Sequence, residues 1–572
     1  MMLAYRPDLD AVGGSLFLTA LVAMLPLLTL FIVLGAMKLP AWKAALASLA
    51  VSLAVAIFAY SMPVGQALMV GLEGSAFGFF PILWIVINAI WVYNMTVVTG
   101  HFDVLRRSFA KVSDDQRIQA VIIAFCFGGL LEALAGFGTP VAITSVMLIA
   151  LGLKPIKAAV VALVANTAPV AFGALAVPLT TLGTASGIPE FTLSQIVGRQ
   201  TALLAFVVPM ALVFIMDKWR GVRQTLPATL TCGFTFAVVH FAISNYVSMQ
   251  LTDIVASLVA AASLVLVLRV WQPAERYVEA PEVGAAAGVA VGGSSHRVAQ
   301  SAGTATATAT AIKPATTDDR DRGQHDSGGE IFKAYAPYLI IIAVFAISQV
   351  PFVKALLDSP TMKFTWPGLD LLKPSGKPST LPTFKLNWLE SPGTLMVIAG
   401  LITIPIIRIS PAKAFQAYLG TYKQLSKAII TVMAVLGLAY VMNASGQTVT
   451  LGTWMAAAGA AFAIISPILG WLGVAVTGSD TSSNALFGAL QVSAANQVGL
   501  NPAVMAAANS SGGVLGKMIS PQNLAIAAAA VGLSGKEGEI FRKVIVWSLG
   551  FLAIMCVMVY LQTTPVLGWM LP

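Results

Sequence analysis

The stretch GGLLEALAGFGTP, from Gly128 to Pro140, decides how this sequence folds. One carboxylate, Glu132, stands in a run of apolar and small residues, and the helix breakers Gly136, Gly138 and Pro140 follow it closely. The flanking runs, VIIAFCF before it and VAITSVMLIAL after it, have the composition of a membrane interior. An acid and a broken backbone are costly there, because the bilayer core offers no water to satisfy them. The stretch therefore predicts a helix that is interrupted inside a membrane, with a polar group that has a functional role at the interruption.

The composition of the whole chain points the same way. Its 572 residues are 58% hydrophobic and only 10% charged, and the mean hydropathy is +0.85. Soluble globular proteins carry about 25% charged residues. Because apolar runs of about 20 residues recur along the chain, we expect an all-α polytopic membrane protein with roughly 10–14 transmembrane segments. A β-barrel is excluded, since its strands would alternate apolar and polar residues.

Charge and cysteine content exclude several other classes. The net charge of +9 is better explained by basic cytoplasmic loops than by nucleic-acid binding. The three cysteines lie far apart in apolar sequence, which argues against a disulfide framework or a metal site.

The N-terminal stretch MMLAYRPDLDAVGG has two acids and one Arg, unlike the basic start of a cleaved signal peptide, so a retained first helix is expected. No catalytic triad or HExxH motif appears, which argues against an intramembrane enzyme.

The chain divides into two membrane halves around a low-complexity segment. Residues 272–330 include AAAGVAVGGSS, TATATATA and DDRDRGQHD, which bury little apolar surface, so a disordered cytoplasmic linker is predicted. The first half, 1–271, has a core at about 79–216; the second, 331–572, has a core at about 428–562 and a Pro-rich periplasmic loop at 351–391. Single apolar spans are expected at about Leu16–Ala36, Ala44–Tyr60, Phe79–Val98, Leu203–Met216, Ala228–Val247, Ile254–Val270, Tyr335–Val350, Gly393–Ile407, Ala428–Met442 and Val544–Leu561. Two longer regions, about Ala120–Leu182 and Thr453–Val531, contain short helices broken by Gly, Pro, Ser and Asn.

Basic loops orient these spans, because Lys and Arg accumulate on the cytoplasmic side of a membrane. Placing the loops around Arg106, Lys218, Lys413 and Lys536 in the cytoplasm gives a consistent topology with both termini outside. In this topology the span at 79–98 runs from outside to inside, and the span at 428–442 runs from inside to outside.

The two longer regions resemble each other. The first reads AGFGTP, GLKP and ANTAPVAFGALAVP, and the second reads TGSDTS, GLNP and ANSSGGVLGKMISP. Asn166 precedes Pro178 by twelve residues, as Asn509 precedes Pro521, and a glycine lies seven residues after each Asn. Since the spans before the two copies run in opposite directions, we predict two inverted-topology repeats with broken helices or re-entrant hairpins. Many secondary transporters build a mid-membrane site in this way.

Polar and helix-breaking residues cluster in both repeats. A helix that starts in mid-membrane points free N–H groups and the positive end of its dipole into the site, which suits a carboxylate. Asn166-Thr167 and Asn509-Ser510-Ser511 are interpreted as caps and side-chain donors of such helix starts. The alternative is that small residues only allow helices to pack closely. The candidate substrate-binding residues are Gly136, Gly138, Thr139, Asn166, Thr167, Thr481, Ser482, Asn509, Ser510, Ser511 and Lys517, with Ser483 as a further donor.

Four ionisable residues lie in apolar surroundings, and a charge at the bilayer centre costs at least about 2.5–3.5 kcal/mol on insertion scales. Desolvation favours the neutral form of a carboxyl group, which suits the loading and release of a proton, so Glu132, Asp480 and Glu73 are the proton-coupling candidates. Lys517 is either the partner of an acid or a counter-charge for the substrate. The alternatives are a permanent ion pair or a position at the membrane interface. His240 lies on an apolar span outside the repeats and is interpreted as structural.

Several long motifs carry a resemblance to a known family: EALAGFGTPVAI, NTAPVAFGALAVP, VGRQ with MDKWRG, TGSDTSSNALFGALQ and ANSSGGVLGKMISPQNLAIAAAAVGL. In these motifs the sequence resembles the bacterial L-lactate permease family, and the likeness covers both halves. The resemblance implies a multi-pass permease of the bacterial inner membrane, without a cofactor. Such a permease imports L-lactate, and often glycolate and related 2-hydroxy monocarboxylates, with protons. Its implied partners are the substrate, protons and the lipid bilayer; the oligomeric state stays open.

The wider ion-transporter superfamily is similar in using two inverted repeats, whose Ser-Asn-Thr-like hairpin tips bind carboxylates. Asn166-Thr167 and Asn509-Ser510 look like the equivalents in this sequence. Ala165 and Ala508 stand where that pattern has a serine, which puts a sodium site in doubt. Sodium-coupled uptake of a di- or tricarboxylate stays open as the alternative, and a non-transporting membrane sensor is a third hypothesis. The sequence does not rank L-lactate, D-lactate and glycolate, because one methyl group in a pocket is worth only about 1–3 kcal/mol.

Overall fold

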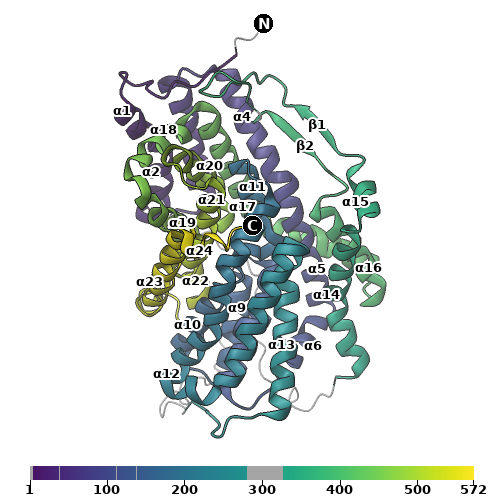
Figure 1. The fold of residues 1–572 in the computed structure, drawn as a ribbon. Helices are drawn as coiled ribbons and strands as arrows, with labels where there is room; N and C mark the ends of the chain where they lie inside the picture. Colours follow the sequence, from purple (N-terminus) through teal and green to yellow (C-terminus); the bar gives the residue numbers. More distant parts are fainter. Residues whose placement is uncertain (1–3, 38, 111, 137, 280–325, 380) are drawn as a thin grey trace, which may run out of the picture.

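The computed structural model describes residues 4–279 and 326–572, except 38, 111, 137 and 380. Within these ranges the chain is almost entirely helical. Ten helical segments are long and apolar enough to cross a membrane, or eleven if one bent pair of helices counts as a span. The helices form one elongated body (Figure 1). The expected all-α polytopic membrane fold is confirmed.

Three of the N-terminal helices, α3, α4 and α5, pack against a long helix of the second half, α17 (Pro411–Ser445). The contact is close: a Cβ atom added at Gly74 would lie 2.6 Å from the carbonyl oxygen of Leu436. Small residues at such positions let helix backbones touch, as is common in membranes. The N-terminal helices as a whole are α1 (Leu16–Ala23), α2 (Leu25–Phe31), the π-helical η1 (Ile32–Ala36), α3 (Ala41–Ala54), η2 (Val55–Ala59), α4 (Val64–Phe77), η3 (Gly78–Leu83), α5 (Trp84–Val98) and α6 (His101–Ala110).

The first complex region forms the interior of the molecule, since the segment Gln116–Ala135 is 100% buried over its apolar window. Its helices are α7 (Gln116–Ala120), η4 (Val121–Phe127), α8 (Gly128–Ala135), α9 (Thr139–Ala150), α10 (Pro155–Ala165), the 3-10 turn η5 (Val170–Phe172) and α11 (Gly173–Ser186). The long α12 (Glu190–Tyr246), η6 (Met249–Leu251) and α13 (Thr252–Val270) follow. Non-helical backbone at Asp217 and Lys218 divides α12 into two rods, which matches the two separate spans expected there.

The second half begins with α14 (Gly328–Ser348) and α15 (Pro351–Asp358), then α16 (Pro392–Ile406) and α17. The second complex region follows as α18 (Gln447–Met455), η9 (Ala456–Ala461), α19 (Phe462–Thr477), α20 (Asp480–Val498), α21 (Pro502–Gly516), η10 (Lys517–Ile519) and α22 (Pro521–Ala530). The chain ends with α23 (Glu537–Gln562) and α24 (Pro565–Gly568).

Both complex regions contain a helical hairpin with a glycine tip. Gly136 (φ +40°) ends α8, Gly138 (φ +84°) precedes α9, and Gly478 (φ +74°) separates α19 from α20. Positive φ angles end a helix and suit glycine, which has no Cβ. In each hairpin the second helix packs back on the first; for example, the Ser483 hydroxyl of α20 donates to the Gly470 carbonyl of α19 (3.3 Å). The expected broken helices are therefore present, while the inverted relation of the repeats stays a prediction.

The second break differs between the two regions. In the first, α10 ends at Ala165, and α10 and the η5–α11 segment meet at an angle of 63°. In the second, α21 runs without interruption to Gly516. The expectation that Asn166 and Asn509 cap helix starts is therefore wrong: Asn166 follows the end of α10, and Asn509 lies inside α21. Glycine at position 512 lets α21 pack closely on α19, because a Cβ there would overlap the Pro467 carbonyl.

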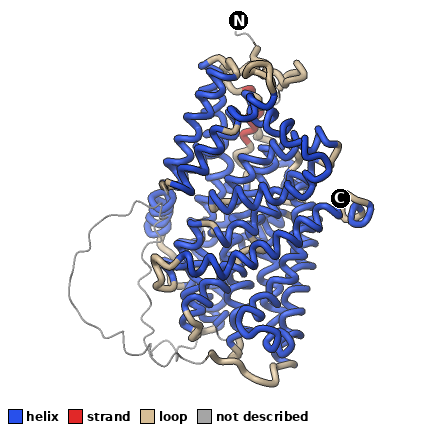
Figure 2. The backbone as a smooth tube through the Cα atoms, turned by 90° about the vertical axis from the view of Figure 1, so that its left-hand side faces the viewer, coloured by secondary structure: helices blue, strands red, loops and turns tan. Residues whose placement is uncertain are grey.

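The segment expected as a Pro-rich loop is partly regular. It contains α15 and an antiparallel hairpin of β1 (Met362–Thr365) and β2 (Thr383–Leu386), in register with Phe364 opposite Phe384. The N-terminal segment joins it, since the amide of Tyr5 donates to the carbonyl of Asp370 (2.9 Å). In Figure 1 the β-hairpin runs along one side from near the N-terminus down to α15, and the lower ends of α12 and α13 lie at the opposite end of the molecule. Figure 2 also shows the strands near the N-terminal end.

Most of the predicted linker, 280–325, lies outside the described residues. Its first residues, 272–279, are described and pack at the break in α12. The guanidinium of Arg117 donates to Asp115 (2.8 Å), to Asp217 (2.8 Å) and to the carbonyl of Glu275 (2.9 Å). Arg117 is 1% exposed and also donates to Gln224 beyond the break (2.7 Å), so this buried cation connects the start of the linker to the break in α12 and to its second rod.

Candidate functional site

The two hairpin tips meet at the first turn of α22. A Cβ atom added at Gly138 would lie 3.3 Å from Oδ1 of Asn523, and one added at Gly478 would lie 2.7 Å from Oε1 of Gln522. The N-termini of α9, α20 and α22 therefore converge. Each helix start carries a partial positive charge, and the hydroxyls of Ser479 and Ser520 cap two of them by accepting from the amides of Ser482 (3.2 Å) and Asn523 (3.3 Å). The meeting point is electrostatically suited to an anion.

A buried ion pair connects the two halves at this place. Nζ of Lys517, at the end of α21, lies 2.5 Å from Oε1 of Glu132 on α8. The side chains are 8% and 3% exposed. The Asn166 amide, at the end of α10, donates to the other oxygen of Glu132 (3.0 Å). Glu132 thus holds a cation from the second half and an amide from the first, while Oδ1 of Asn166 has no hydrogen-bond partner among the described residues.

The second carboxylate, Asp480, is held by neutral donors. Oδ2 of Asp480 accepts hydrogen bonds from the Ser510 hydroxyl (2.6 Å) and the Asn484 amide (3.1 Å). The amide of Asn509 donates to Oδ1 of Asn484 (2.9 Å), which continues the network into α21. Oδ1 of Asp480 is buried and lacks a hydrogen-bond partner within the described ranges. It lies against Gly513, where a Cβ would overlap it.

Two contacts join the carboxylates to the broken part of α11. The amide of Asn484 also donates to the carbonyl of Pro178 (3.1 Å). A Cβ at Gly173 would lie 2.8 Å from Oε1 of Glu132, so glycine is needed for the chain to pass the carboxylate. Ala174, Leu175 and Ala176 have positive φ angles, a conformation that costs energy for residues with a Cβ. We call the group Glu132, Asn166, Asp480, Ser510 and Lys517 the central cluster.

The central cluster has an uneven charge count. Lys517 balances the carboxylate of Glu132, and the carboxylate of Asp480 remains without a full counter-charge. Buried carboxylates without a counter-charge are expensive, and proteins offset them with a proton, donors or a cation. A site of this kind can hold a proton and can exchange one anionic partner of Lys517 for another.

The structure brings many of the predicted site residues together, but not all in the expected way. Gly136 and Gly138 form the first tip, Thr139 begins α9, and Thr481 and Ser482 lie in the first turn of α20. The remaining candidates make other contacts: Thr167 donates to its own helix at the Leu163 carbonyl (3.4 Å), Ser511 donates to Gln200 of α12 (2.6 Å), and Ser483 supports the hairpin.

Glu73 lies apart from the central cluster, on α4 beside α17. It is 1% exposed, and its Oε2 has no hydrogen-bond partner in the described part of the chain. No contact connects it to Glu132 or Asp480 among the described residues. Its role in proton coupling stays a prediction.

Sequence reasoning missed Asn484 and Gln491. Both lie on α20 among small and apolar residues; Asn484 contacts Asp480 and the Pro178 carbonyl, and the Gln491 amide donates to Oδ1 of Asn509 (3.1 Å). The spacing of these residues from Asp480 in the sequence could have identified them as site residues. Residues four positions apart share one face of a helix, and Asn484 is four residues after Asp480.

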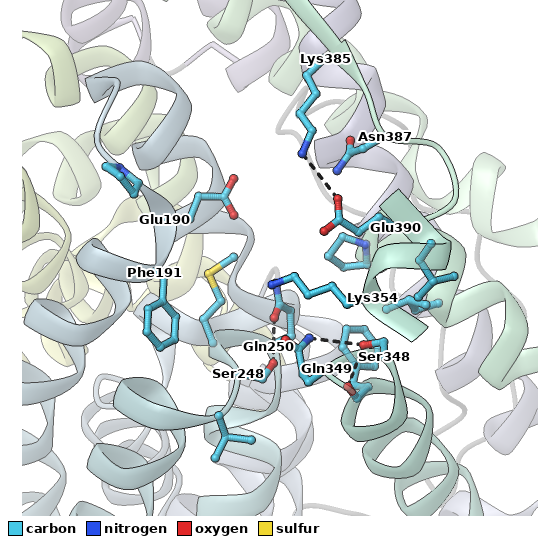
Figure 3. Close-up of a pocket in the computed structure, with 17 residues that line it drawn as sticks. Glu190, Phe191, Ser248, Gln250, Ser348, Gln349, Lys354, Lys385, Asn387 and Glu390 are labelled. Atoms are coloured by element: carbon cyan, nitrogen blue, oxygen red, sulfur yellow. Dashed lines mark hydrogen bonds and ion pairs between the residues drawn. The ribbon is translucent and has the colours of Figure 1, made fainter. Parts of the chain in front are cut away.

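Three cavities lie beside the β-hairpin, with volumes of about 580, 880 and 230 Å³. Glu190 and Lys385 line all three. Figure 3 shows Glu190 on one wall and Lys385 with Glu390 opposite, 3.5 Å apart between Nζ and Oε2. Asp358 lies 3.9 Å from Lys385. The hydroxyl of Thr361 hydrogen-bonds to Asp358 and lowers its pKa, so this carboxylate is charged at neutral pH.

These cavities approach the central cluster along α11. The smallest is lined by Thr180 and Thr184, together with Tyr440 of α17. Thr180 is two residues from Pro178, whose carbonyl binds Asn484 of the network around Asp480. Glu132, Asp480 and Lys517 do not line any of the three cavities. The central cluster is thus separate from these cavities, and α11 connects the two places through Thr180 and Pro178.

Charged groups enclosed where broken membrane helices meet are typical of secondary transporters, and this defines the class of protein. The comparisons with known proteins agree. A family model described as L-lactate permease matches residues 19–566. The chain belongs to the L-lactate permease family, and it is a multi-pass protein of the bacterial inner membrane rather than an enzyme.

Named relatives match over nearly their whole length. The L-lactate permease of Bacillus subtilis (strain 168) is 39% identical over 589 residues, covering 100% of this chain and 99% of the relative. The L-lactate permease of Escherichia coli (strain K12) is 40% identical, with 98% of each chain covered. The glycolate permease GlcA of the same strain is also 40% identical, with 96% of each chain covered. A solved structure of the Alcanivorax borkumensis YdaH transporter has a TM-score of 0.42 and 13% identity, covering 87% of this chain and 88% of that one.

Proposed function

We propose that this protein imports L-lactate, and glycolate as a related 2-hydroxy monocarboxylate, together with protons. One observation carries the proposal: the buried pair of Lys517 and Glu132, at a point where three helix N-termini converge. The relatives named as L-lactate and glycolate permeases support the class of substrate. A monocarboxylate has one negative group, and one buried lysine supplies one matching charge.

The proposed binding step is an exchange of partners at Lys517. The substrate carboxylate takes the place of Glu132 beside Nζ, and Glu132 takes up a proton as it leaves the pair. Asn166 supplies specificity for a 2-hydroxy acid, because its free Oδ1 can accept a hydrogen bond from the substrate hydroxyl. A substrate without that hydroxyl leaves the oxygen unpaired, which costs about 1–3 kcal/mol.

Charge balance makes the proton obligatory. The substrate adds one negative charge to a buried cluster that already has two carboxylates and one lysine. A net charge in a medium of low polarity is strongly unfavourable, so the loaded cluster is stable only when at least one proton enters with each anion. Asp480 is the second proton-binding candidate, since its Oδ1 has no partner within the described ranges.

We propose that the three cavities beside the β-hairpin are the access route from the periplasmic side. Lys385 and Lys354 are exposed cations there and attract a small anion by long-range electrostatics. The linker ends and the Arg117 contacts then face the cytoplasm, as the distribution of basic loops predicts. The substrate leaves toward that side after the ion pair between the halves opens.

Uptake of labelled L-lactate into proteoliposomes tests the function. With an inward proton gradient we expect accumulation above equilibrium, and with a sodium gradient at fixed pH we expect none. Accumulation that follows sodium rather than protons would contradict proton coupling. Competition by glycolate, acetate and succinate measures the substrate class; equal competition by acetate would contradict the role of the 2-hydroxyl group.

The variant Asp480→Asn separates transport from proton coupling. It keeps the size and most hydrogen bonds of the side chain but does not bind a proton. We expect it to lose concentrative uptake and to retain exchange of labelled for unlabelled lactate. The matched control is Glu539→Gln, which neutralises an exposed acid at the start of α23 and should behave as the wild type. Normal accumulation by Asp480→Asn would exclude the proposed role.

A further inference from the structure

A second buried charged group lies behind the central cluster, between α12 and α13. Nδ1 of His240 lies 2.9 Å from Oδ1 of Asp253, and Nε2 of His240 lies 2.8 Å from the Thr201 hydroxyl. His240 and Asp253 are both 0% exposed at the side chain. Oδ2 of Asp253 has no hydrogen-bond partner among the residues described. Neither the family assignment nor the mechanism above uses these residues, and the sequence suggested only a structural histidine.

The hydrogen bonds of this triad allow two proton counts. The Thr201 hydroxyl lies 2.7 Å from the Val197 carbonyl and 2.8 Å from His240, and it has one proton to donate. If Thr201 donates to Val197, Nε2 of His240 must carry a proton to make its own bond. A second proton then lies between Nδ1 and Asp253, and the pair is neutral overall.

If Thr201 instead donates to Nε2, that nitrogen carries no proton. One proton remains between His240 and Asp253, and the pair has a net charge of −1. Both arrangements keep the same heavy-atom positions and satisfy both ring nitrogens, since a hydroxyl rotates freely. The triad can therefore gain or lose one proton without any movement of helices.

The triad lies close enough to the central cluster for its proton affinity to depend on the charge of that cluster. Ser257, one turn after Asp253 on α13, packs against α8, because a Cβ at Gly129 would lie 2.7 Å from its hydroxyl oxygen. Gly129 is one turn before Glu132 on the same helix. The Phe172 ring, from the break in the first repeat, stands edge-on to His240 with ring centroids 4.9 Å apart.

Glu132 is the ionisable side chain of α8, the helix that packs against α13 beside the triad. On η4, Cys126 points to Cys232 instead (3.6 Å), and η5, η6 and α11 carry no ionisable side chain. Lys517 is held at Glu132. The charge that the triad senses thus changes when Glu132 gains a proton or exchanges its partner.

We propose that Thr201, His240 and Asp253 form a second proton-binding site, which exchanges one proton in response to the charge of the central cluster. A charged Glu132 favours the neutral, protonated triad, because two negative groups repel each other in a buried site. When Glu132 becomes neutral, the triad holds its proton less tightly. By thermodynamic reciprocity, the proton count of the triad must then alter lactate binding. This inference rests on the proposed proton-coupled function.

Calorimetry on the purified full-length protein tests the inference. Lactate binding is measured between pH 5 and 8 in buffers of different ionisation enthalpy, which gives the number of protons taken up per lactate. In the variant Asp253→Asn the amide can still donate to Nδ1 of a neutral His240, but it does not titrate. We expect the number of protons taken up per lactate to differ from that of the wild type within this pH range.

Ser194→Ala is the matched control. Its hydroxyl donates to the Ser244 carbonyl within the two rods of α12 (2.9 Å), so the variant loses a buried hydrogen bond but no titratable group. It should follow the wild-type curve. Thr201→Val is the second test variant, because it removes the hydroxyl that the proton exchange requires, and it is used if Asp253→Asn does not fold.

The outcomes are distinguishable. Proton uptake in the wild type with superimposable curves for the folded triad variants would overturn the second site and leave the proposed function intact. Lactate binding to the wild type with no proton uptake at any pH would overturn proton coupling itself, and the triad's role with it.

Discussion

Replacing Lys517 by methionine would remove the cation from the buried ion pair that joins the two halves. Methionine has a similar length and no charge, so packing is largely conserved and the change isolates electrostatics. Glu132 would then be left at 3% side-chain exposure with only the Asn166 amide as a donor. Breaking one side of a buried pair costs about 3–5 kcal/mol, because the remaining charge is uncompensated.

The double variant Glu132→Gln/Lys517→Met gives the decisive comparison. It removes both charges and leaves two neutral side chains of nearly the original size. Replacing a buried ion pair by neutral groups is often close to neutral for stability, since the desolvation penalty disappears as well. We therefore expect the double variant to be more stable than either single variant. Independent sites would instead add to within about 0.5 kcal/mol.

The assay is unfolding of the purified protein by titration with a denaturing detergent, followed by tryptophan fluorescence. Lys427→Met is the control, since it removes an exposed lysine of α17 and should change the free energy of unfolding by no more than about 0.5 kcal/mol. Additive losses in the two single variants would refute the view that Glu132 and Lys517 are energetically coupled. Lactate uptake should be lost in both Lys517 variants, because the substrate loses its counter-charge even when the fold recovers.

Three further predictions concern other parts of the molecule. Gly513→Ala places a methyl group onto Asp480, so we expect a loss of about 1–3 kcal/mol and slower lactate uptake, whereas Gly550→Ala, with open space around it, should leave both unchanged. Arg117→Lys loses the planar, multiply bonded guanidinium at the linker, and thermal unfolding should report a destabilisation of about 2–3 kcal/mol. Lys385→Ala should raise the apparent KM for lactate about two- to fivefold at low ionic strength, and this difference should shrink in about 0.5 M salt because exposed charges are screened.

Each of these predictions has an outcome that contradicts it. Equal uptake by the two glycine variants would mean that the space beside Asp480 is not needed. Full stability of Arg117→Lys would show that the linker contacts contribute little. A KM effect of Lys385→Ala that persists in high salt would point to direct contact with the substrate rather than long-range attraction.

The hairpin tips were predictable from sequence because their cause is local. Gly136, Gly138 and Gly478 adopt positive φ angles, and glycine is the residue that adopts them without strain. The membrane spans were predictable for the same reason, since each depends on a continuous apolar run. These features need no knowledge of what the chain contacts elsewhere.

The error at Asn509 has a physical reason. The sequences ANTAP and ANSSG look alike as polar interruptions, but only the first contains a proline, Pro169, which has no N–H to continue a helix. Asn509 lacks such a neighbour, and α21 continues until Pro521 approaches. A buried Asn or Ser in a membrane helix therefore marks a polar contact, and a breaker must be found separately before a helix end is inferred.

The β-hairpin was missed because prolines dominated the interpretation of its segment. The strands KFT and FKL alternate in a way typical of a sheet, and the rings of Phe364, Trp366 and Phe384 stack across them, with Phe364 and Phe384 centroids 5.6 Å apart. The partners of the central cluster were beyond sequence reasoning for a different reason. Lys517 and Glu132 are 385 residues apart, and only the packed fold brings them together.

The unequal breaks in the two halves explain how transport and charge are coupled under the proposed function. The early break after α10 places Asn166 beside Glu132, whereas the uninterrupted α21 carries Lys517 to the same carboxylate from the other half. Opposite charges on two bodies resist separation, since each would be left buried and unpaired. A substrate anion satisfies Lys517 and a proton satisfies Glu132, so the two halves separate without an unpaired charge only when both have bound. The anion alone leaves Glu132 charged and unpaired, and the proton alone leaves Lys517 unpaired, so relative movement of the halves is suppressed in both cases.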